Sequence, residues 1–121
     1  MYLGDFLGAL AVIRASLSTS FRPPRAVSNA ARRGLELRKR FGRGGTPVGV
    51  ARAVQLKNQR AVSLQTIGRM YSYFARHSVD RRPGWDDPKR PSAGYIAWLL
   101  WGGDPGKVWA TAIWKRFAQV V

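Results

Sequence analysis

Cysteine is absent from this 121-residue sequence, and histidine occurs once, as His77. Without cysteine the chain has no disulfides and no thiolate ligands for zinc, and a single histidine excludes a metal site built from several imidazoles. Acidic residues are also scarce, because only six Asp or Glu accompany 21 Lys or Arg. What remains is a strongly basic chain with a formal net charge of +15.

The positive charge is concentrated in one part of the chain. From Arg14 to Arg76 there are fourteen Lys or Arg residues and a single acid, Glu36, whereas the rest holds seven basic and five acidic residues. Like charges at this density repel one another, and nucleic-acid phosphates supply the opposite charge. Arginine outnumbers lysine sixteen to five, and its guanidinium suits bidentate contacts with phosphate or guanine. We therefore expect a nucleic-acid partner, with DNA favoured over RNA.

Length and apolar content predict one all-α domain. Hydrophobic residues make up 45% of the chain, with five Trp, five Phe and four Tyr, which is enough to build one core. Apolar positions recur at helical spacing between glycine and proline breaks. We expect a compact bundle of about four to five short helices. A basic domain with a Trp-rich C-terminal core would occupy residues 26–121, after an apolar helical arm and Pro-rich linker over residues 1–25.

Long hydrophobic runs are missing as well. The apolar stretch over residues 2–13 is interrupted by Asp5 and is too short to span a bilayer. A secretory signal carries its positive charge before the apolar run, whereas Arg14 follows it here, and an organellar transit peptide avoids acids. Residues 2–17 instead predict a helix with one apolar face, which docks on the core or on a partner protein.

The densest positive charge falls on a predicted helix over residues 28–41. Ser28 suits its N-cap, and Gly42 suits the left-handed residue that ends many helices. Only Glu36 offers a nearby negative charge to the basic residues of this segment, which are Arg32, Arg33, Arg38, Lys39, Arg40 and Arg43. A solvated basic face is one interpretation, and contact with nucleic-acid phosphates is the one we favour.

A glycine-rich turn over residues 42–47 follows this helix. Gly44 and Gly45 permit close approach of a phosphate to the backbone, and Arg43 adds positive charge. Thr46 as N-cap and Pro47 at the first position predict a new helix, whose N-terminus attracts anions. The turn lacks the Gly-Lys-Ser/Thr ending of a P-loop, which argues against ATP or GTP chemistry. An anion cradle and a plain turn are the two interpretations.

Two further helices are predicted, one over residues 47–58 and one from Ser63 to about residue 79. Helical spacing turns inward Val50, Ala51, Val54 and Leu56 in the first, and Ile67, Met70, Tyr71 and Phe74 in the second. As a helix-turn-helix, the pair would present Gln65, Thr66 and Arg69 to base edges. Arg52 of the first helix completes the set of candidate nucleic-acid-binding residues. The connection over residues 58–62 is long for that motif, so an antiparallel helical hairpin is the alternative.

The C-terminal part predicts a loop over residues 80–91 and two helices. Ser92 caps the first, over residues 93–101, and Asp104 with Pro105 begins the last. Four of the five Trp lie between residues 98 and 114, and large aromatic side chains at helical spacing are typical of a core. We expect Trp85 and Trp114 to be partly exposed, as base-stacking or partner-anchoring residues.

Catalytic residues are hard to assemble from this sequence. His77 falls near a helix C-terminus, a favourable place for an imidazole, and no nucleophile or acid is spaced to pair with it locally. Asp80, Asp86 and Asp87 are close in sequence, but basic neighbours and a following proline indicate solvated turn residues. We predict a protein that is not an enzyme and that needs no metal or cofactor.

Five segments also carry a family resemblance, namely Ser28–Arg38, Gly42–Ala53, Arg69–Met70, Ser72–Asp80 and Pro91–Asp104. Together they resemble a small helical domain that recurs in tailed-phage proteins, including those of cyanobacterial phages, alone or beside head-assembly modules. The resemblance covers about residues 28 to 110 and implies a phage origin. It implies no catalytic residues, and residues 1–20 lie outside it.

Three functions are compatible with these observations. The one we prefer is a nucleic-acid-binding module that holds phosphates with the basic helix and the glycine-rich turn. The second is a virion structural or assembly protein, anchored through residues 2–17 in a neighbouring phage subunit, with its basic face toward packaged DNA. The third is an inhibitor that binds an acidic host protein with the same face. The expected location is the phage virion or the cytoplasm of the infected host.

Overall fold

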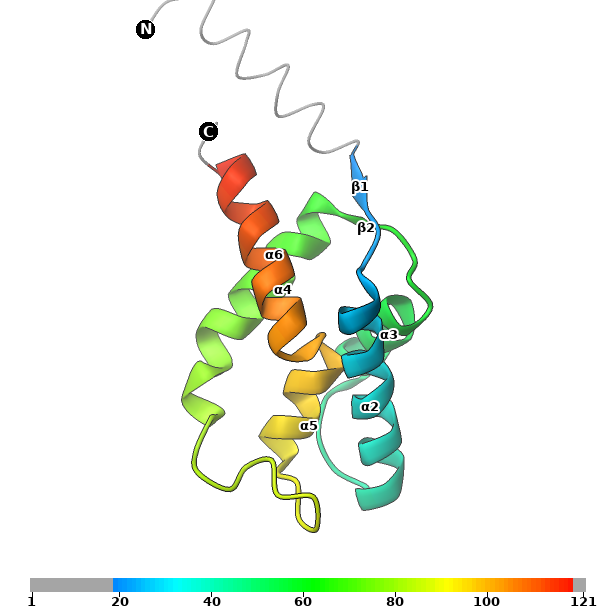
Figure 1. Ribbon diagram of the computed structural model, residues 1–121, viewed down its shortest axis with the longest axis vertical. Helices are drawn as coiled ribbons and strands as arrows, with labels where there is room; N and C mark the ends of the chain where they lie inside the picture. Colours follow the sequence, from blue (N-terminus) through cyan, green and yellow to red (C-terminus); the bar gives the residue numbers. More distant parts are fainter. Residues whose placement is uncertain (1–18, 119–121) are drawn as a thin grey trace, which may run out of the picture.

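The structure, a computed structural model, describes residues 19–118 of the chain (Figure 1). The order of elements is β1 (Ser20–Phe21), α2 (Arg25–Phe41), α3 (Pro47–Lys57), β2 (Val62–Ser63), α4 (Leu64–His77), the 3-10 helix η1 (Ser78–Asp80), α5 (Ala93–Leu100) and α6 (Gly103–Ala118). The predicted all-α bundle is confirmed. The arm predicted over residues 2–17 lies outside the described residues. Within residues 19–118, no helix combines the length and the apolar character needed to cross a membrane.

Helix α6 lies between α2 and α4, and α5 packs beneath α6 against α2 (Figure 1). Helix α3 packs on α2 and α5. The two ends of the described chain lie together, because the Phe21 ring of β1 contacts the Phe117 ring of α6 at 5.7 Å between centroids. Helix α6 therefore contacts both α2 and α4, whereas α3 contacts α2 and α5.

Helix α2 begins three residues before the predicted start. Its N-cap is Pro24, and Ser28, which we expected to cap the helix, lies inside it. The buried Ser28 hydroxyl donates instead to the backbone carbonyl of Lys57 at 2.7 Å, which joins α2 to the end of α3. The predicted C-terminal end is confirmed, because Gly42 adopts a left-handed φ of 64° that glycine accepts without strain.

The predicted Pro-rich linker is part of the packed fold. β1 pairs antiparallel with β2, with Phe21 opposite Val62, and Pro23 is fully buried. Gln59 makes two hydrogen bonds to this segment. Its side-chain amide donates to the Pro23 carbonyl at 3.0 Å, and its backbone carbonyl accepts from the Arg22 guanidinium at 2.9 Å. The packed unit thus starts before residue 26.

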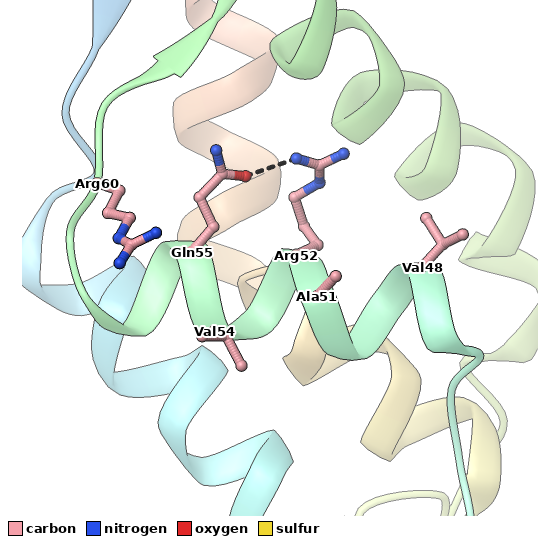
Figure 2. Close-up of a pocket in the computed structure, with 6 residues that line it drawn as sticks. All are labelled: Val48, Ala51, Arg52, Val54, Gln55 and Arg60. Atoms are coloured by element: carbon pink, nitrogen blue, oxygen red, sulfur yellow. Dashed lines mark hydrogen bonds between the residues drawn. The ribbon is translucent and has the colours of Figure 1, made fainter.

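Helix α3 has its predicted boundaries but a different buried face. Thr46 caps it by accepting from the Gly49 N–H at 3.3 Å, and Asn58 ends it. Of the residues predicted to face inward, Leu56 is buried and Val50 is half-buried, whereas Ala51 and Val54 are exposed and project from the outer side of the helix (Figure 2). The small residues Gly49 and Ala53 take the inner positions, because α3 approaches its neighbours too closely for larger side chains.

Helix α4 follows the sequence prediction closely. The Ser63 hydroxyl caps it by accepting from the Thr66 N–H at 3.1 Å. Ile67, Met70 and Phe74 are buried at helical spacing, while Tyr71 is half-buried and stacks on Trp114. This apolar face packs against α6 and accounts for most of that side of the core.

The junction of α5 and α6 corrects one capping prediction. Ser92 caps α5 as expected, accepting from the Tyr95 N–H at 3.0 Å. Helix α6 begins at Gly103, so Asp104 lies in its first turn and is not its cap. The Asp104 carboxylate instead accepts from the Trp98 indole at 2.9 Å and pairs with Arg81.

Trp98 occupies the centre of the core. It is 1% exposed, and its ring meets those of Phe74 and Trp85 edge to face. The prediction of a Trp-rich core is therefore confirmed for this residue. Trp85 and Trp114 are partly exposed as expected, and Trp101 and Trp109 are partly exposed as well.

Candidate nucleic-acid interface

The outer side of α2 presents a row of cations. Arg25, Arg32 and Lys39 recur every seven residues, which places them along one line of the helix, and Arg33 with Arg40 forms a parallel line. All five are exposed, and we call them the basic face of α2. The opposite side of the helix is buried through residues such as Val27, Ala31 and Leu37, so packing of the bundle fixes the direction of the basic face.

These cations have little local compensation. Arg33 reaches Glu36 at 3.8 Å with both side chains more than half exposed, a geometry that contributes little stability. Arg32 donates to the neutral amide of Asn29 at 3.2 Å, and Arg40 lies over the Phe41 ring. Throughout residues 19–118, Arg33 and Arg81 are the only Lys or Arg side chains in an ion pair with a carboxylate. The excess charge is therefore available to an external anion.

The glycine-rich turn places two more cations at the C-terminal end of α2. Arg38, Arg43 and the glycines of the turn line a pocket of about 350 Å³. The Arg38 Nε donates to the Gly44 carbonyl at 3.0 Å, which holds the guanidinium against the turn. Arg43 is exposed. This arrangement suits an anion between the two guanidinium groups.

The two central glycines of the turn have a packing role that sequence reasoning did not assign. Gly44 and Gly45 adopt φ values of 92° and 82°. A Cβ at Gly44 would stand 2.7 Å from Ile96, and one at Gly45 would stand 2.4 Å from Leu100. The turn therefore lies directly on α5, and its glycines are required for that contact whether or not an anion binds.

Arg52 of α3 packs against the segment that follows α5. Arg52 is half-buried, with its guanidinium over the Trp101 ring at 5.5 Å, and it donates to Gln55 Oε1 at 2.6 Å (Figure 2). Its Nε is buried without a hydrogen-bond partner. Burial lowers the pKa of Arg52, and the neighbouring positive charge of Arg69 lowers it further. Neither Arg52 nor Arg69 has a carboxylate partner within residues 19–118.

The helix-turn-helix prediction is not supported. Helix α3 packs on α2 and α5, whereas α4 packs on α6, so the two helices do not form a packed pair. Strand β2 occupies part of the connection between them. Thr66, a predicted base-reading residue, is only 8% exposed, and its hydroxyl bonds to that of Ser63. Gln65 and Arg69 are exposed, but they line a groove formed with the C-terminal part of the chain.

The groove that Gln65 and Arg69 line runs along α4 and has a volume of about 430 Å³. Gln65, Arg69 and Arg76 line it from α4, and Trp101 and Trp114 line it from the C-terminal part of the chain. Sequence reasoning missed Arg76 and Trp101 as functional candidates. One signal was present, because residues 65, 69, 72 and 76 are all polar and follow helical spacing.

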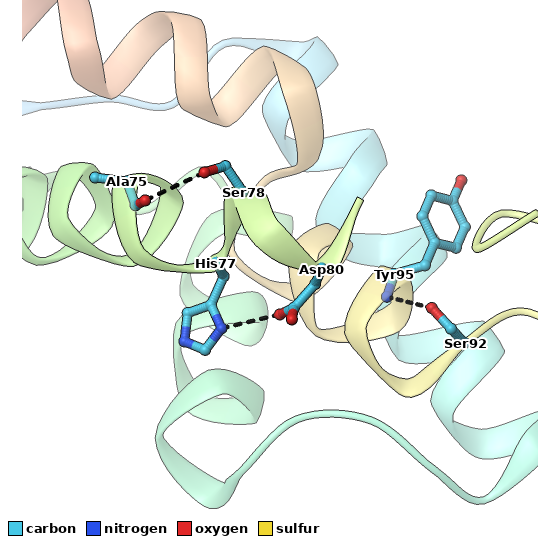
Figure 3. A network of polar contacts seen from close by, with 6 residues as sticks. All are labelled: Ala75, His77, Ser78, Asp80, Ser92 and Tyr95. Atoms are coloured by element: carbon cyan, nitrogen blue, oxygen red, sulfur yellow. Dashed lines mark hydrogen bonds and ion pairs between the residues drawn. The ribbon is translucent and has the colours of Figure 1, made fainter. Parts of the chain in front are cut away.

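His77 and Asp80 form a polar network at the end of α4 (Figure 3). The imidazole Nδ1 lies 3.0 Å from Asp80 Oδ2, and the ring stacks on Tyr73 at 4.5 Å. The two serines in the same view serve the backbone, since Ser78 donates to the Ala75 carbonyl and Ser92 caps α5. Over residues 19–118, no three His, Cys, Asp or Glu side chains gather as metal ligands.

The predicted site residues therefore fall into three groups. The basic face of α2 contains Arg32, Arg33, Lys39 and Arg40, the turn brings together Arg38, Arg43, Gly44 and Gly45, and the α4 groove is lined by Gln65 and Arg69. Arg52 lies outside that lining, against Gln55 and Trp101. Thr66 belongs to none of the three groups. In comparisons with known proteins, no protein-family model, curated protein or solved structure matches the chain.

Proposed function

We propose that this protein binds nucleic acid without catalysing a reaction, and that the basic face of α2 holds phosphates of DNA. The observation that carries the proposal is five exposed cations on one helix face with a single exposed acid, Glu36, beside them. Phosphate contacts of this kind release condensed counterions and supply most of the affinity in non-specific DNA binding.

The length of the basic face suits a DNA backbone. At a rise of 1.5 Å per residue, the 17 residues of α2 extend over about 25 Å. A DNA strand places one phosphate about every 3.4 Å along its axis, so the face spans roughly seven phosphates. Because phosphate contacts carry no sequence information, we expect binding that is insensitive to DNA sequence.

The turn after α2 extends the same contact. Arg43 and Arg38 lie at the C-terminal end of the helix and face a pocket large enough for an anion. The hydrogen bond from Arg38 to the Gly44 carbonyl fixes one guanidinium before any ligand arrives, which lowers the entropy lost on binding. Phage DNA is the partner that follows from the resemblance over residues 28–110, and the virion and host-cytoplasm hypotheses both use this face.

A charge-matched pair of triple variants tests the proposal. Replacing Arg32, Lys39 and Arg40 with Gln should weaken duplex DNA binding at least tenfold at fixed salt, and equally for unrelated sequences, because each change removes a phosphate contact. The control replaces Arg82, Lys89 and Arg90, which are exposed on the loop near Asp86 and Asp87. Fluorescence anisotropy measures both. Equal losses from the two triple variants would disprove the role of α2.

A further inference from the structure

The groove along α4 has no acidic residue in its lining. Arg69 and Arg76 reach it from α4, and both are exposed and have no carboxylate partner within residues 19–118. Arg52 lies outside this lining and belongs to a separate hollow along α3. Burial raises the pKa of Tyr73, and the neighbouring Asp80 raises it further. The Asp80 carboxylate itself lies 3.0 Å from His77 Nδ1. Two guanidinium groups therefore line one groove that has no carboxylate in its lining, which favours an anionic ligand.

The wall of the groove is built from stacked planar groups. The Tyr73 ring lies parallel to Trp101, with centroids 4.6 Å apart and planes 9° apart, and the His77 ring stacks on Tyr73 at 4.5 Å. The Arg52 guanidinium also lies over the Trp101 ring, at 5.5 Å from its centroid. Trp114 closes the other side, where Gly68 allows its ring to lie against α4. Partly exposed aromatic rings beside arginines are the surface on which unpaired bases stack.

We propose that this groove binds a nucleotide of single-stranded nucleic acid, with the phosphate held by Arg69 and Arg76 and the base placed against Trp114, all of which line it. The inference rests on the proposed function, in which nucleic acid is the ligand of the protein. It goes further by assigning a second binding site, the α4 groove, to an unpaired strand. A duplex fits poorly, because its bases are stacked on one another and offer no free ring face to the groove. The volume of about 430 Å³ falls within the range of ligand pockets.

The groove and the basic face of α2 are built from different helices. The groove arginines belong to α4 and the basic face to α2, and α6 packs against both helices (Figure 1). Substitutions in one site therefore leave the charge and the packing of the other intact. This separation allows the two binding functions to be tested independently in the full-length chain.

The test compares a 15-nucleotide oligo-dT strand, an abasic strand of equal length, a duplex and a free mononucleotide. Fluorescence anisotropy measures binding of the strands and the duplex, and competition against labelled oligo-dT measures binding of the mononucleotide. Replacing both Arg69 and Arg76 with Gln should weaken oligo-dT binding about tenfold more than replacing Arg82 and Arg90 with Gln. Duplex binding should fall equally in both. The abasic strand should bind the unaltered protein about tenfold more weakly than oligo-dT, because stacking of one base contributes about that much.

Trp114→Leu separates stacking from charge. The leucine keeps an apolar contact with Gly68 but removes the ring face, so oligo-dT binding should fall to the abasic level while thermal unfolding shows a folded protein. Equal binding of oligo-dT and the abasic strand would overturn the groove proposal, as would equal losses from the two arginine pairs. Either result leaves the α2 proposal standing if duplex binding persists. If a free mononucleotide binds as tightly as oligo-dT, the ligand of the groove is a nucleotide and not a strand, and the proposal is overturned.

Discussion

At the scale of single residues, Asp104 connects the long loop to the core. Its carboxylate accepts the buried Trp98 indole N–H and pairs with Arg81, whose guanidinium lies over the Trp98 and Trp85 rings at 5.2 Å. The hydrogen bond from Arg81 lowers the pKa of Asp104, partial burial opposes that shift, and the hydrogen bond from Trp98 reinforces it. One acid thus fixes a loop and also satisfies a buried donor.

Asp104→Asn should make this role measurable through pH. Because folding lowers the pKa of Asp104 below its ordinary value of 3.8, the ionised carboxylate stabilises the fold above that pH, and the contribution is lost as pH falls through the folded-state pKa. We expect a loss of about 1 kcal/mol in unfolding free energy at pH 7, kept small by solvent exposure.

Urea unfolding at pH 7 and near pH 3 measures the effect. The difference between Asp104→Asn and the unaltered protein should shrink at the lower pH, whereas Asp86→Asn, in the exposed loop, serves as the control. A difference for Asp104→Asn that is the same at both pH values would contradict the ion pair with Arg81 as its cause.

At the scale of elements, local chemistry and tertiary packing were predictable to different degrees. Thr46, Ser63 and Ser92 cap their helices as expected, because a cap depends on residues adjacent in sequence. Ser28 has the same chemistry but is directed to the Lys57 carbonyl, a partner that only the pairing of α2 with α3 supplies. The helix-turn-helix, one of two alternatives for α3 and α4, is not supported by the packing, since helix partners are set by contacts across the whole bundle.

Gly34→Ala tests the packing of α2 on α5. A Cβ at Gly34 would stand 2.8 Å from the Leu100 backbone nitrogen and 3.0 Å from Leu99, so the two helices would have to separate. Helix propensity alone favours alanine by about 1 kcal/mol, while overpacking costs about 1–3 kcal/mol. We expect a net loss of about 1 kcal/mol in unfolding free energy, measured by urea denaturation.

Ala26→Gly measures the contribution of helix propensity to the unfolding free energy without a packing change, because Ala26 is exposed in the same helix. It should cost about 1 kcal/mol. An increase in stability for Gly34→Ala, equal in size to the loss at Ala26, would show that the close contact between α2 and α5 is absent in solution.

At the scale of the whole molecule, charge and core occupy separate parts of the bundle. Sequence predicted that the cations around Arg32 and Arg40 would be exposed, because their excess over acids is visible in composition. It did not predict that Arg76 and Trp114 would line one groove. These residues come from α4 and α6, and they are brought together because α4 packs on α6.

The most direct measurement of the central claim is the salt dependence of duplex binding by the unaltered chain and by the α2 triple variant. If the basic face holds phosphates, log affinity falls linearly with log salt, with a slope of about −0.9 for each phosphate neutralised. The variant lacking the charges of Arg32, Lys39 and Arg40 should then have a slope shallower by roughly 2.7. An affinity that does not change with salt, or equal slopes for the two proteins, would contradict the account.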